Sequence, residues 1–518
     1  MSKRLILNSA SAAVLYAVNI VIAFIMSPVV VRALGNRDYG IWEMLLSFCG
    51  YMGILELGLG PAVIRYVARE MALQNQDSLN RVFNSAFWCL LLVGLLSLIG
   101  MCLVALIPET LLNLQPGEIE SLSMLCVMAG FNLLVQFIGT LFVAFLMGRQ
   151  EHFLVNMFRA FVYSAQAVLV FLALTRWEGS KLIWVAGITL AGNIFQYGVL
   201  CGLVFRREGS LSLSRSGFSY STMKELYLFG LKSALLMVSD RIQRQSLPVI
   251  IGHTIGASSV VFFALPKRLV DYARDFVVSL GFPLMPYFSG VDALRQEGER
   301  MKEWVPVSRA VSFLTLPAAA TVMALGEPFL NIWLGAEYGE NGRWVVMALG
   351  ASFLLTGMFS NSTRVLIAAD KHGRPAKKAL CISIAAVSSA IPITRWYGVT
   401  GSAVVLLAAD LTACWVFWAA ASKHIRITLP EHIDATVRPL LIPFLLLAGW
   451  LAAARILFVF SAYWGLATTA IIGFSLYLIA AWKFSLKKVE KDSFKIHLRN
   501  FFRKNVPPVR FSTAETKK

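Results

Sequence analysis

Long apolar runs alternate with short polar segments along almost the whole chain. A helix that crosses a bilayer needs about 20 mostly apolar residues, and about fourteen segments meet this requirement. They cover residues 11–34, 41–63, 83–107, 120–147, 153–175, 181–204, 226–252, 257–289, 307–333, 343–368, 376–395, 399–421, 436–459 and 461–483. The pattern therefore predicts an all-α polytopic membrane protein.

The first twelve segments fall into two groups of six. Asn113 and Asn331 are each followed four residues later by a glycine, and Gly35 and Gly256 show a similar separation of roughly 220 residues. An even number of helices separates the copies, so we expect two parallel six-helix lobes. The predicted organisation is a first lobe over 1–205, a basic linker over 206–225, a second lobe over 226–422, two additional helices over 423–484 and a basic tail over 485–518.

Composition strengthens the membrane assignment. Hydrophobic residues make up 57% of the chain, charged residues 15%, and the mean hydropathy is +0.67. These values exclude an ordinary soluble enzyme and a disordered protein. The net charge of +18 is carried mostly by alternate loops and by both ends of the chain. This bias indicates cytoplasmic termini of a multi-pass inner-membrane protein, and it argues against a nucleic-acid partner.

No motif for an enzyme, a cofactor or a metal is found. The seven cysteines lie inside apolar segments without metal-like spacing, and the six histidines form no ligand pair. The chain lacks a Gly-x-x-x-x-Gly-Lys-Ser/Thr loop, a Ser-His-Asp arrangement and a His-Glu-x-x-His helix. We therefore expect a protein that is not an enzyme and has no bound cofactor.

The seventh and eighth segments carry charges where lipid would otherwise lie. Each such charge costs about 2.5–3.5 kcal/mol on insertion scales, so a dense cluster should line a water-filled cavity. In the eighth segment the charges fall within an arc of about 120° of one helix. Arginine matches phosphate oxygens bidentately and lysine adds a point charge, so the basic residues predict an anionic substrate. The predicted substrate-binding residues are Lys232, Arg241, Arg244, Lys267, Arg268 and Arg274.

A structural alternative stays open for the same cluster. Asp240–Arg244 and Lys267–Asp271 have the spacing of ion pairs that would simply hold helices together. The acids are also candidates for coupling transport to H⁺ or Na⁺, because burial and nearby cations shift their proton affinity in opposite directions. The candidate coupling residues are Asp240, Asp271, Asp275, Glu56 and Asp410, the last with Arg364 or Arg395 as a partner.

The first lobe is much less charged than the second. Asn132 and Gln136 lie one helical turn apart in the fourth segment. Two interpretations are equally open, because the amides can hydrogen-bond either sugar hydroxyls or a neighbouring helix.

Three segments carry a resemblance to a known family. Residues 34–42 read LGNRDYGIW, residues 56–70 read ELGLGPAVIRYVARE and residues 330–338 read LNIWLGAEY. The chain resembles the polysaccharide-biosynthesis and O-antigen flippases of the multidrug/oligosaccharidyl-lipid/polysaccharide exporter (MOP) superfamily. That resemblance implies two six-helix lobes around a V-shaped cavity. It also implies that undecaprenyl-pyrophosphate-linked oligosaccharide passes from the inner to the outer leaflet by alternating access, with a polysaccharide polymerase as a candidate partner besides membrane lipids.

Three alternatives remain beside this interpretation. A cation-coupled multidrug exporter would keep the fold, but a cationic cavity repels the cations such exporters favour. A lipid II flippase would share the mechanism. A membrane glycan polymerase or ligase would need a large outer loop with catalytic groups, and the outer loops predicted here are short.

Overall fold

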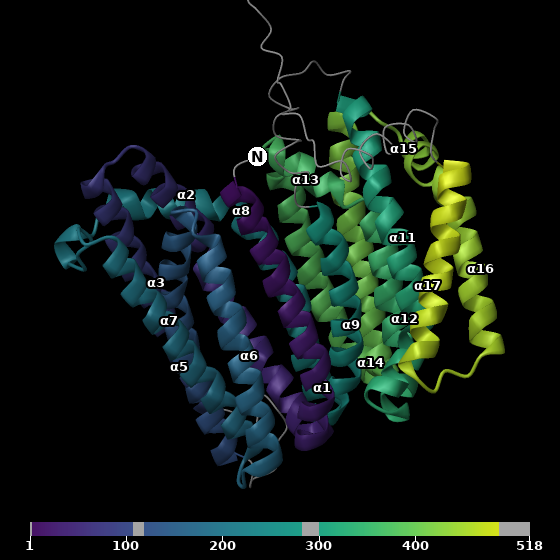
Figure 1. Ribbon diagram of the computed structural model, residues 1–518, viewed down its shortest axis with the longest axis horizontal. Coiled ribbons are helices and arrows are strands. Elements are labelled where there is room, and N and C mark those ends of the chain that lie inside the picture. Colours follow the sequence, from purple (N-terminus) through teal and green to yellow (C-terminus); the bar gives the residue numbers. More distant parts are fainter. Residues whose placement is uncertain (1–2, 107–118, 282–299, 486–518) are drawn as a thin grey trace, which may run out of the picture.

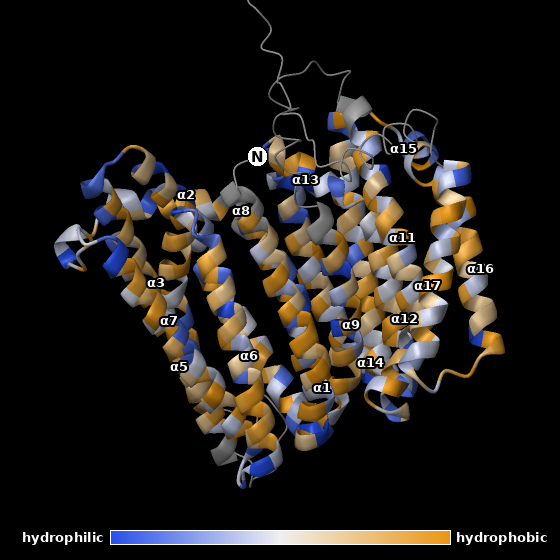
Figure 2. Cartoon of the chain, in the orientation of Figure 1, coloured by the Kyte–Doolittle hydropathy of each residue, from blue (hydrophilic) through white to orange (hydrophobic). Residues whose placement is uncertain are grey.

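The computed structural model describes residues 3–106, 119–281 and 300–485, and every regular element in these ranges is helical. Polar residues lie mainly at the helix ends, and apolar residues cover most of the helix surfaces (Figure 2). The elements are α1 (Lys3–Met52), η1 (Gly53–Glu56), α2 (Leu59–Ala72), α3 (Gln76–Leu106), α5 (Ile119–Gly148), α6 (His152–Arg176), α7 (Lys181–Arg207), η3 (Arg215–Gly217), α8 (Tyr220–Ile255), α9 (Ala257–Gly281), α11 (Arg300–Trp333), α12 (Ala336–Met358), α13 (Asn361–Ala368), α14 (Gly373–Ile425), α15 (Leu429–Thr436), η5 (Arg438–Leu440), α16 (Leu441–Leu457), α17 (Tyr463–Ala480) and η6 (Ala481–Ser485).

Two of these helices are each interrupted by one glycine. Gly35 in α1 has φ 78° and ψ 170°, and Gly398 in α14 has φ 63° and ψ −152°. Residues with a side chain rarely adopt these dihedral angles, whereas glycine adopts them readily. Each of α1 and α14 therefore contains two helices joined at its glycine.

The number of membrane crossings depends on how these helices are counted. By length and composition alone, nine helices of the described residues can cross a membrane, or ten with the bent pair α12 and α13. Starting from these ten, we can count α1 and α14 as two crossings each and add the charged helices α8 and α9. The total is then fourteen, the number that the sequence predicts. The fourteen crossings stay a prediction.

The segment predicted to cross the membrane over residues 41–63 is not one helix. Leu57 has φ 48° and Gly58 has φ 77°, so two consecutive left-handed residues end the first helix and start α2. The sequence around this break is a continuous apolar run, and only the two glycines Gly58 and Gly60 indicate that the helix could end there. The seventh helix also differs, because α8 begins at Tyr220, inside the predicted linker.

The helices form two bundles that lean away from each other toward one end (Figure 1). One bundle contains α2, α3, α5, α6 and α7, and the other contains α9, α11, α12, α13 and α14, with α1 between them. We call the end with α2, η3, α13 and α15 the basic end, and the end with Gly35, Gly256, Gly335 and Gly398 the glycine end. We call the first bundle the N-lobe and the second the C-lobe.

The buried apolar residues show why the molecule has this V shape. One core, which includes Met44, Met101 and Phe263, joins helices of both lobes in the half near the glycine end. Toward the basic end the cores separate, with Phe83 and Phe145 in the N-lobe and Trp418 in the C-lobe. Among the described residues, the lobes thus share a packed interior only near the glycine end.

Helix α8 contacts both lobes. Its first turns carry Leu226, which is buried in the N-lobe core, and Gly230, whose Cα lies so close to Leu57 and Gly58 that a side chain would clash with their backbone. Further along, α8 packs against α14 and α9 of the C-lobe. The helix therefore begins in one lobe and continues in the other.

The last two helices pack on the outside of the C-lobe. Tyr477 of α17 donates a hydrogen bond to the carbonyl oxygen of Phe313 in α11 at 2.9 Å. At the basic end, the Trp304 indole donates to Nδ1 of the fully buried His432 in α15 at 3.3 Å. These contacts attach the C-terminal helices to α11.

Part of the predicted internal repeat can be followed in the structure. Gly35 and Gly256 both have positive φ, 78° and 107°, at the junction of two long helices. Asn331 and Gly335 end α11 and precede α12, whereas Asn113 and Gly117 lie outside the described residues. The tail after Ser485 lies outside them as well. The predicted domain boundaries stay predictions.

Candidate functional site

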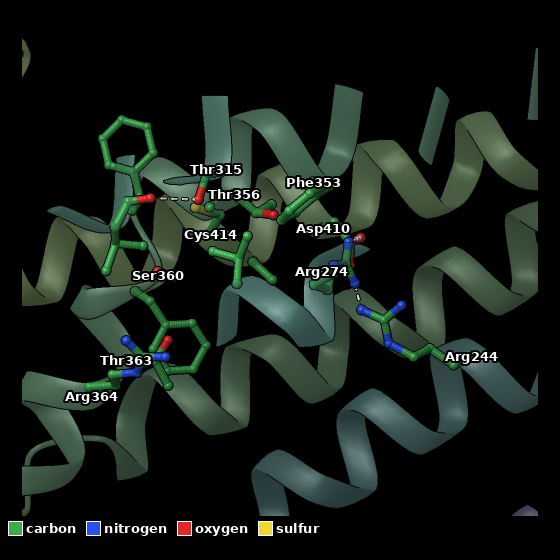
Figure 3. A pocket seen from close by; sticks show the side chains of 16 residues that line it. Arg244, Arg274, Thr315, Phe353, Thr356, Ser360, Thr363, Arg364, Asp410 and Cys414 are labelled. Carbon is green, nitrogen blue, oxygen red and sulfur yellow. Dashed lines mark hydrogen bonds and ion pairs between the residues drawn. The ribbon is translucent and has the colours of Figure 1, made fainter. Parts of the chain in front are cut away.

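A cavity of about 280 Å³ lies inside the C-lobe. Helices α8, α9, α11, α12, α13 and α14 all contribute side chains to its wall (Figure 3). Guanidinium, carboxylate and hydroxyl groups mix there with apolar side chains. The polar groups that line it are those of Arg244, Arg274, Arg364, Asp410, Thr315, Thr356, Ser360 and Thr363.

Asp410 is the carboxylate at the centre of this arrangement. It accepts hydrogen bonds from the Ser352 hydroxyl at 2.6 Å and from the Gln243 amide at 3.0 Å. Arg244 and Arg274 approach its two oxygens only to 3.9 and 3.8 Å. The carboxylate therefore compensates both guanidinium charges at a distance, while neutral groups take its hydrogen bonds.

The arginines consequently keep donors that no group of the described residues uses. A guanidinium has five N–H donors, yet Arg274 makes no hydrogen bond within the described residues and its side chain is only 18% exposed. Arg364 donates one hydrogen bond, to the Asn361 side chain at 3.0 Å. These unused donors face a cavity that an anion can fill.

Both ion pairs of the structural alternative are present. Arg244 donates to Asp240 at 2.6 Å, and Lys267 donates to Asp271 at 2.5 Å. Three guanidiniums and one carboxylate line the cavity, and Asp240 pairs with Arg244 beside it. One positive charge of this group is therefore left without a carboxylate.

Three predicted basic residues, Lys267, Arg268 and Arg241, do not line the cavity, and Lys267 pairs with Asp271 instead. Arg268 donates to Glu43 of α1 at 2.5 Å, which forms an ion pair between the helices of the two halves. Arg241 donates to the carbonyl oxygen of Gly50 in α1 at 3.0 Å. The side chain of Lys232 lies outside the part of the chain that the structure describes, although its backbone belongs to α8.

The five candidate coupling acids do not form one cluster. Asp240, Asp271 and Asp410 belong to the network around the cavity, and Asp275 is exposed on the same helix as Asp271. Glu56 lies in η1 of the N-terminal half and accepts a hydrogen bond from the backbone of Gly60 at 3.3 Å.

The predicted partners of Asp410 are wrong. Arg395 is an exposed residue near Gly398 at the glycine end, and Arg364 bonds Asn361 instead. Asp410 faces Arg244 and Arg274 because α14 packs against α8 and lies next to α9. Spacing along one sequence carries no information on such contacts between distant helices.

Between α5 and α7 of the N-lobe, the polar side chains that meet are uncharged amides. Asn193 of α7 donates to the Asn132 side chain of α5 at 2.8 Å, so the contact with a neighbouring helix is formed. Gln136 lies one turn further along α5 and is half-buried. No group of three or more His, Cys, Asp and Glu residues in the described ranges is placed to hold a metal ion.

Comparison with known sequences assigns the chain to a family. The model of the polysaccharide biosynthesis protein family matches residues 5–291, which is more than half of the chain. The chain belongs to this family. A Shigella flexneri protein, provisionally named as an O-antigen transporter, is 24% identical over 368 residues, covering 68% of this chain and 80% of that protein.

Solved structures with the same fold are transporters of the MOP superfamily. An inward-facing multidrug-resistance MATE transporter superimposes with a TM-score of 0.66 and 14% identity, covering 80% of this chain and 94% of that one. The lipid II flippase MurJ in an inward closed conformation gives 0.63 and 13%, covering 92% of this chain and 99% of that one. A MOP transporter from Pyrococcus furiosus gives 0.60 and 13%, with 81% and 95% covered. The named relatives are transporters or flippases, and none is an enzyme.

Sequence reasoning for this family member missed several groups. Glu43 lies in an apolar segment, and a lone acid at such a position signals a buried cation as its partner. The cavity hydroxyls of Thr315, Thr356, Ser360 and Thr363 gave no signal, because serine and threonine are common in transmembrane helices. Arg364 was considered only as a partner of Asp410.

Proposed function

We propose that the protein is a flippase for lipid-linked oligosaccharides. In this proposal it moves undecaprenyl-pyrophosphate-linked repeat units from the inner to the outer leaflet of the bacterial inner membrane. The observation that carries the proposal is Arg274, a mostly buried guanidinium that faces a polar cavity and makes no hydrogen bond with any described residue. Such a group is costly in a membrane unless an anion binds it.

The proposed binding mode follows from the cavity wall. The diphosphate takes the free donors of Arg274 and Arg244, which present planar forks to phosphate oxygens. Hydroxyl groups and Arg364 face the part of the cargo next to it. The lipid tail stays in the bilayer. The ion pairs Asp240–Arg244 and Lys267–Asp271 each lie within one helix, α8 and α9 respectively, and compensate part of the positive charge of that helix.

Transport is proposed to occur by alternating access. The lobes share a core at the glycine end and separate toward the basic end, so the structure supports a state open at the basic end. Positive loops favour the cytoplasmic side, which would place this opening and both termini in the cytoplasm. Asp240 and Asp275 are exposed, and we propose them as the first carboxylates to test for H⁺ or Na⁺ coupling.

Deletion of the gene tests the proposal directly. We expect a pyrophosphate-linked oligosaccharide to accumulate and the surface polysaccharide to be lost, both measured by mass spectrometry. Unchanged glycans with increased drug sensitivity would favour a multidrug exporter, and a general growth defect with accumulated lipid II would favour a lipid II flippase.

Variants of the deleted gene then test the site. Strains that carry Arg274→Ala or Arg244→Ala should export no more polysaccharide than the deletion strain does. The amount of folded protein in the membrane should be normal in both. Arg395→Gln is the matched control, because it removes an exposed positive charge far from the cavity. Wild-type export by both cavity variants would contradict the assignment.

A further inference from the structure

A second cavity of about 400 Å³ lies on the outside of the C-lobe. Helix α11 forms its back, and α12 and α16 form its sides. Most of its wall is apolar, including Met323, Met347, Phe444 and Leu451. It shares no lining residue with the cavity that contains Arg274. We call this surface the lateral groove.

Three charged residues lie together in the lateral groove, near the glycine end of its helices. Arg455 of α16 donates to Oε2 of Glu327 in α11 at 2.7 Å. Arg343 of α12 lies 3.5 Å from the same oxygen and makes no hydrogen bond with any described residue. Its guanidinium is 5.2 Å from the centre of the Trp344 ring, and its side chain is 51% exposed.

The two arginines have different relations to Glu327. The short Arg455–Glu327 bond by itself neutralises the carboxylate and attaches α16 to α11. Arg343 adds a second positive charge that this attachment does not need. The group keeps one net positive charge, and Arg343 can turn toward a ligand while Arg455 and Glu327 stay bonded.

A ligand of this surface needs a negative head and an apolar tail. A soluble anion would leave the apolar wall uncovered, and a hydrocarbon without charge would leave Arg343 unmatched. Trp344 is 57% exposed at the same level, which is typical of the boundary between hydrocarbon and head groups. Charge complementarity and the apolar wall together select a membrane lipid with a phosphate group.

We propose that the lateral groove binds one anionic glycerophospholipid of the surrounding membrane. Its phosphate lies against Arg343 and Arg455, and one acyl chain lies along α11 between α12 and α16. The bound lipid links α16 to α12, which have few direct contacts with each other. The site does not depend on the cargo of the transporter, so it can be tested whatever that cargo is.

Native mass spectrometry of the purified full-length protein measures this binding. The delipidated protein is titrated with phosphatidylglycerol in detergent, and wild type is compared with Arg343→Gln. Arg176→Gln is the matched control, since Arg176 is an exposed arginine in the last turn of α6, also at the glycine end. We expect one phosphatidylglycerol to bind wild type and the control at least about tenfold more tightly than Arg343→Gln, the loss expected for one charge-assisted hydrogen bond.

A second variant and two other ligands separate the parts of the proposal. Ala448→Phe fills the groove without touching the arginines, and it should also weaken phosphatidylglycerol binding. Diacylglycerol, which lacks the phosphate, should bind wild type and Arg343→Gln equally weakly. The proposal is overturned if Arg343→Gln binds phosphatidylglycerol as wild type does, or if inorganic phosphate displaces the lipid, which would indicate a soluble-anion site.

Discussion

Between α5 and α7 of the N-lobe, two amide side chains meet, whereas around the cavity of the C-lobe guanidiniums face a carboxylate. Asn193 and Asn132 satisfy each other through one hydrogen bond. Arg274 and Asp410 lie 3.8 Å apart beside an open cavity. An amide pair inside a membrane protein contributes about 0.6 kcal/mol on average, while an uncompensated charge costs several times as much. One lobe uses polar groups to join helices, and the other keeps charged groups available for a ligand.

The strongest test of this contrast removes the shared carboxylate of the C-lobe. Among the described residues, Asp410→Ala leaves Arg274 without a carboxylate partner in a mostly buried place, and it leaves Arg244 with Asp240 alone. We expect the free energy of unfolding to fall by about 3–5 kcal/mol, the usual cost of breaking a buried ion pair. Reversible unfolding in mixed micelles measures the change.

A double variant shows whether the arginine charge is responsible for this loss. Asp410→Ala combined with Arg274→Ala should be more stable than Asp410→Ala alone, because the guanidinium that lost its carboxylate is gone. If the double variant loses the sum of both single effects, charge compensation at Asp410 is not the cause.

A smaller effect is expected where the two halves meet. Glu43→Gln replaces the charged acceptor of Arg268 by a neutral amide of the same shape, and should cost about 1.5–3 kcal/mol. The exchange Glu43→Arg with Arg268→Glu should restore part of the stability. Thermal unfolding of the wild type, of Glu43→Gln and of the exchanged double variant measures these stabilities. An exchanged variant that is no more stable than Glu43→Gln would show that the pair does not join the lobes.

The smallest effect is expected in the N-lobe. Asn193→Ala removes one amide hydrogen bond between α7 and α5, and should lower the free energy of unfolding by about 0.6–1.7 kcal/mol. Polysaccharide export should stay at the wild-type level in the same strain. Loss of export with normal protein amounts would instead show that Asn132 and Asn193 contact the cargo.

The fold could be predicted largely because bilayer thickness imposes a simple rule on every crossing helix. Runs of about 20 apolar residues mark the helices, and Gly35 and Gly256 mark two of the reversals. The break at Leu57 was missed, because a leucine in the left-handed conformation has no sequence signature and the surrounding residues are as apolar as a crossing helix.

The candidate site was predicted only in its chemistry. Helical periodicity is local, so one charged face could be predicted for the eighth segment, and the Lys267–Asp271 pair within that face is formed. The pairing of Asp410 with Arg274, and of Glu43 with Arg268, joins residues more than a hundred positions apart. Such pairings follow from helix packing, which a single sequence does not specify.

The position of α8 has a consequence for the synthesis of the protein. Leu226 completes the core of the N-lobe, and Gly230 packs on the turn at Leu57 and Gly58. During translation, the first lobe therefore lacks part of its interior until α8 has left the ribosome. The first half of the chain therefore cannot complete its packed core before synthesis of the second half has begun.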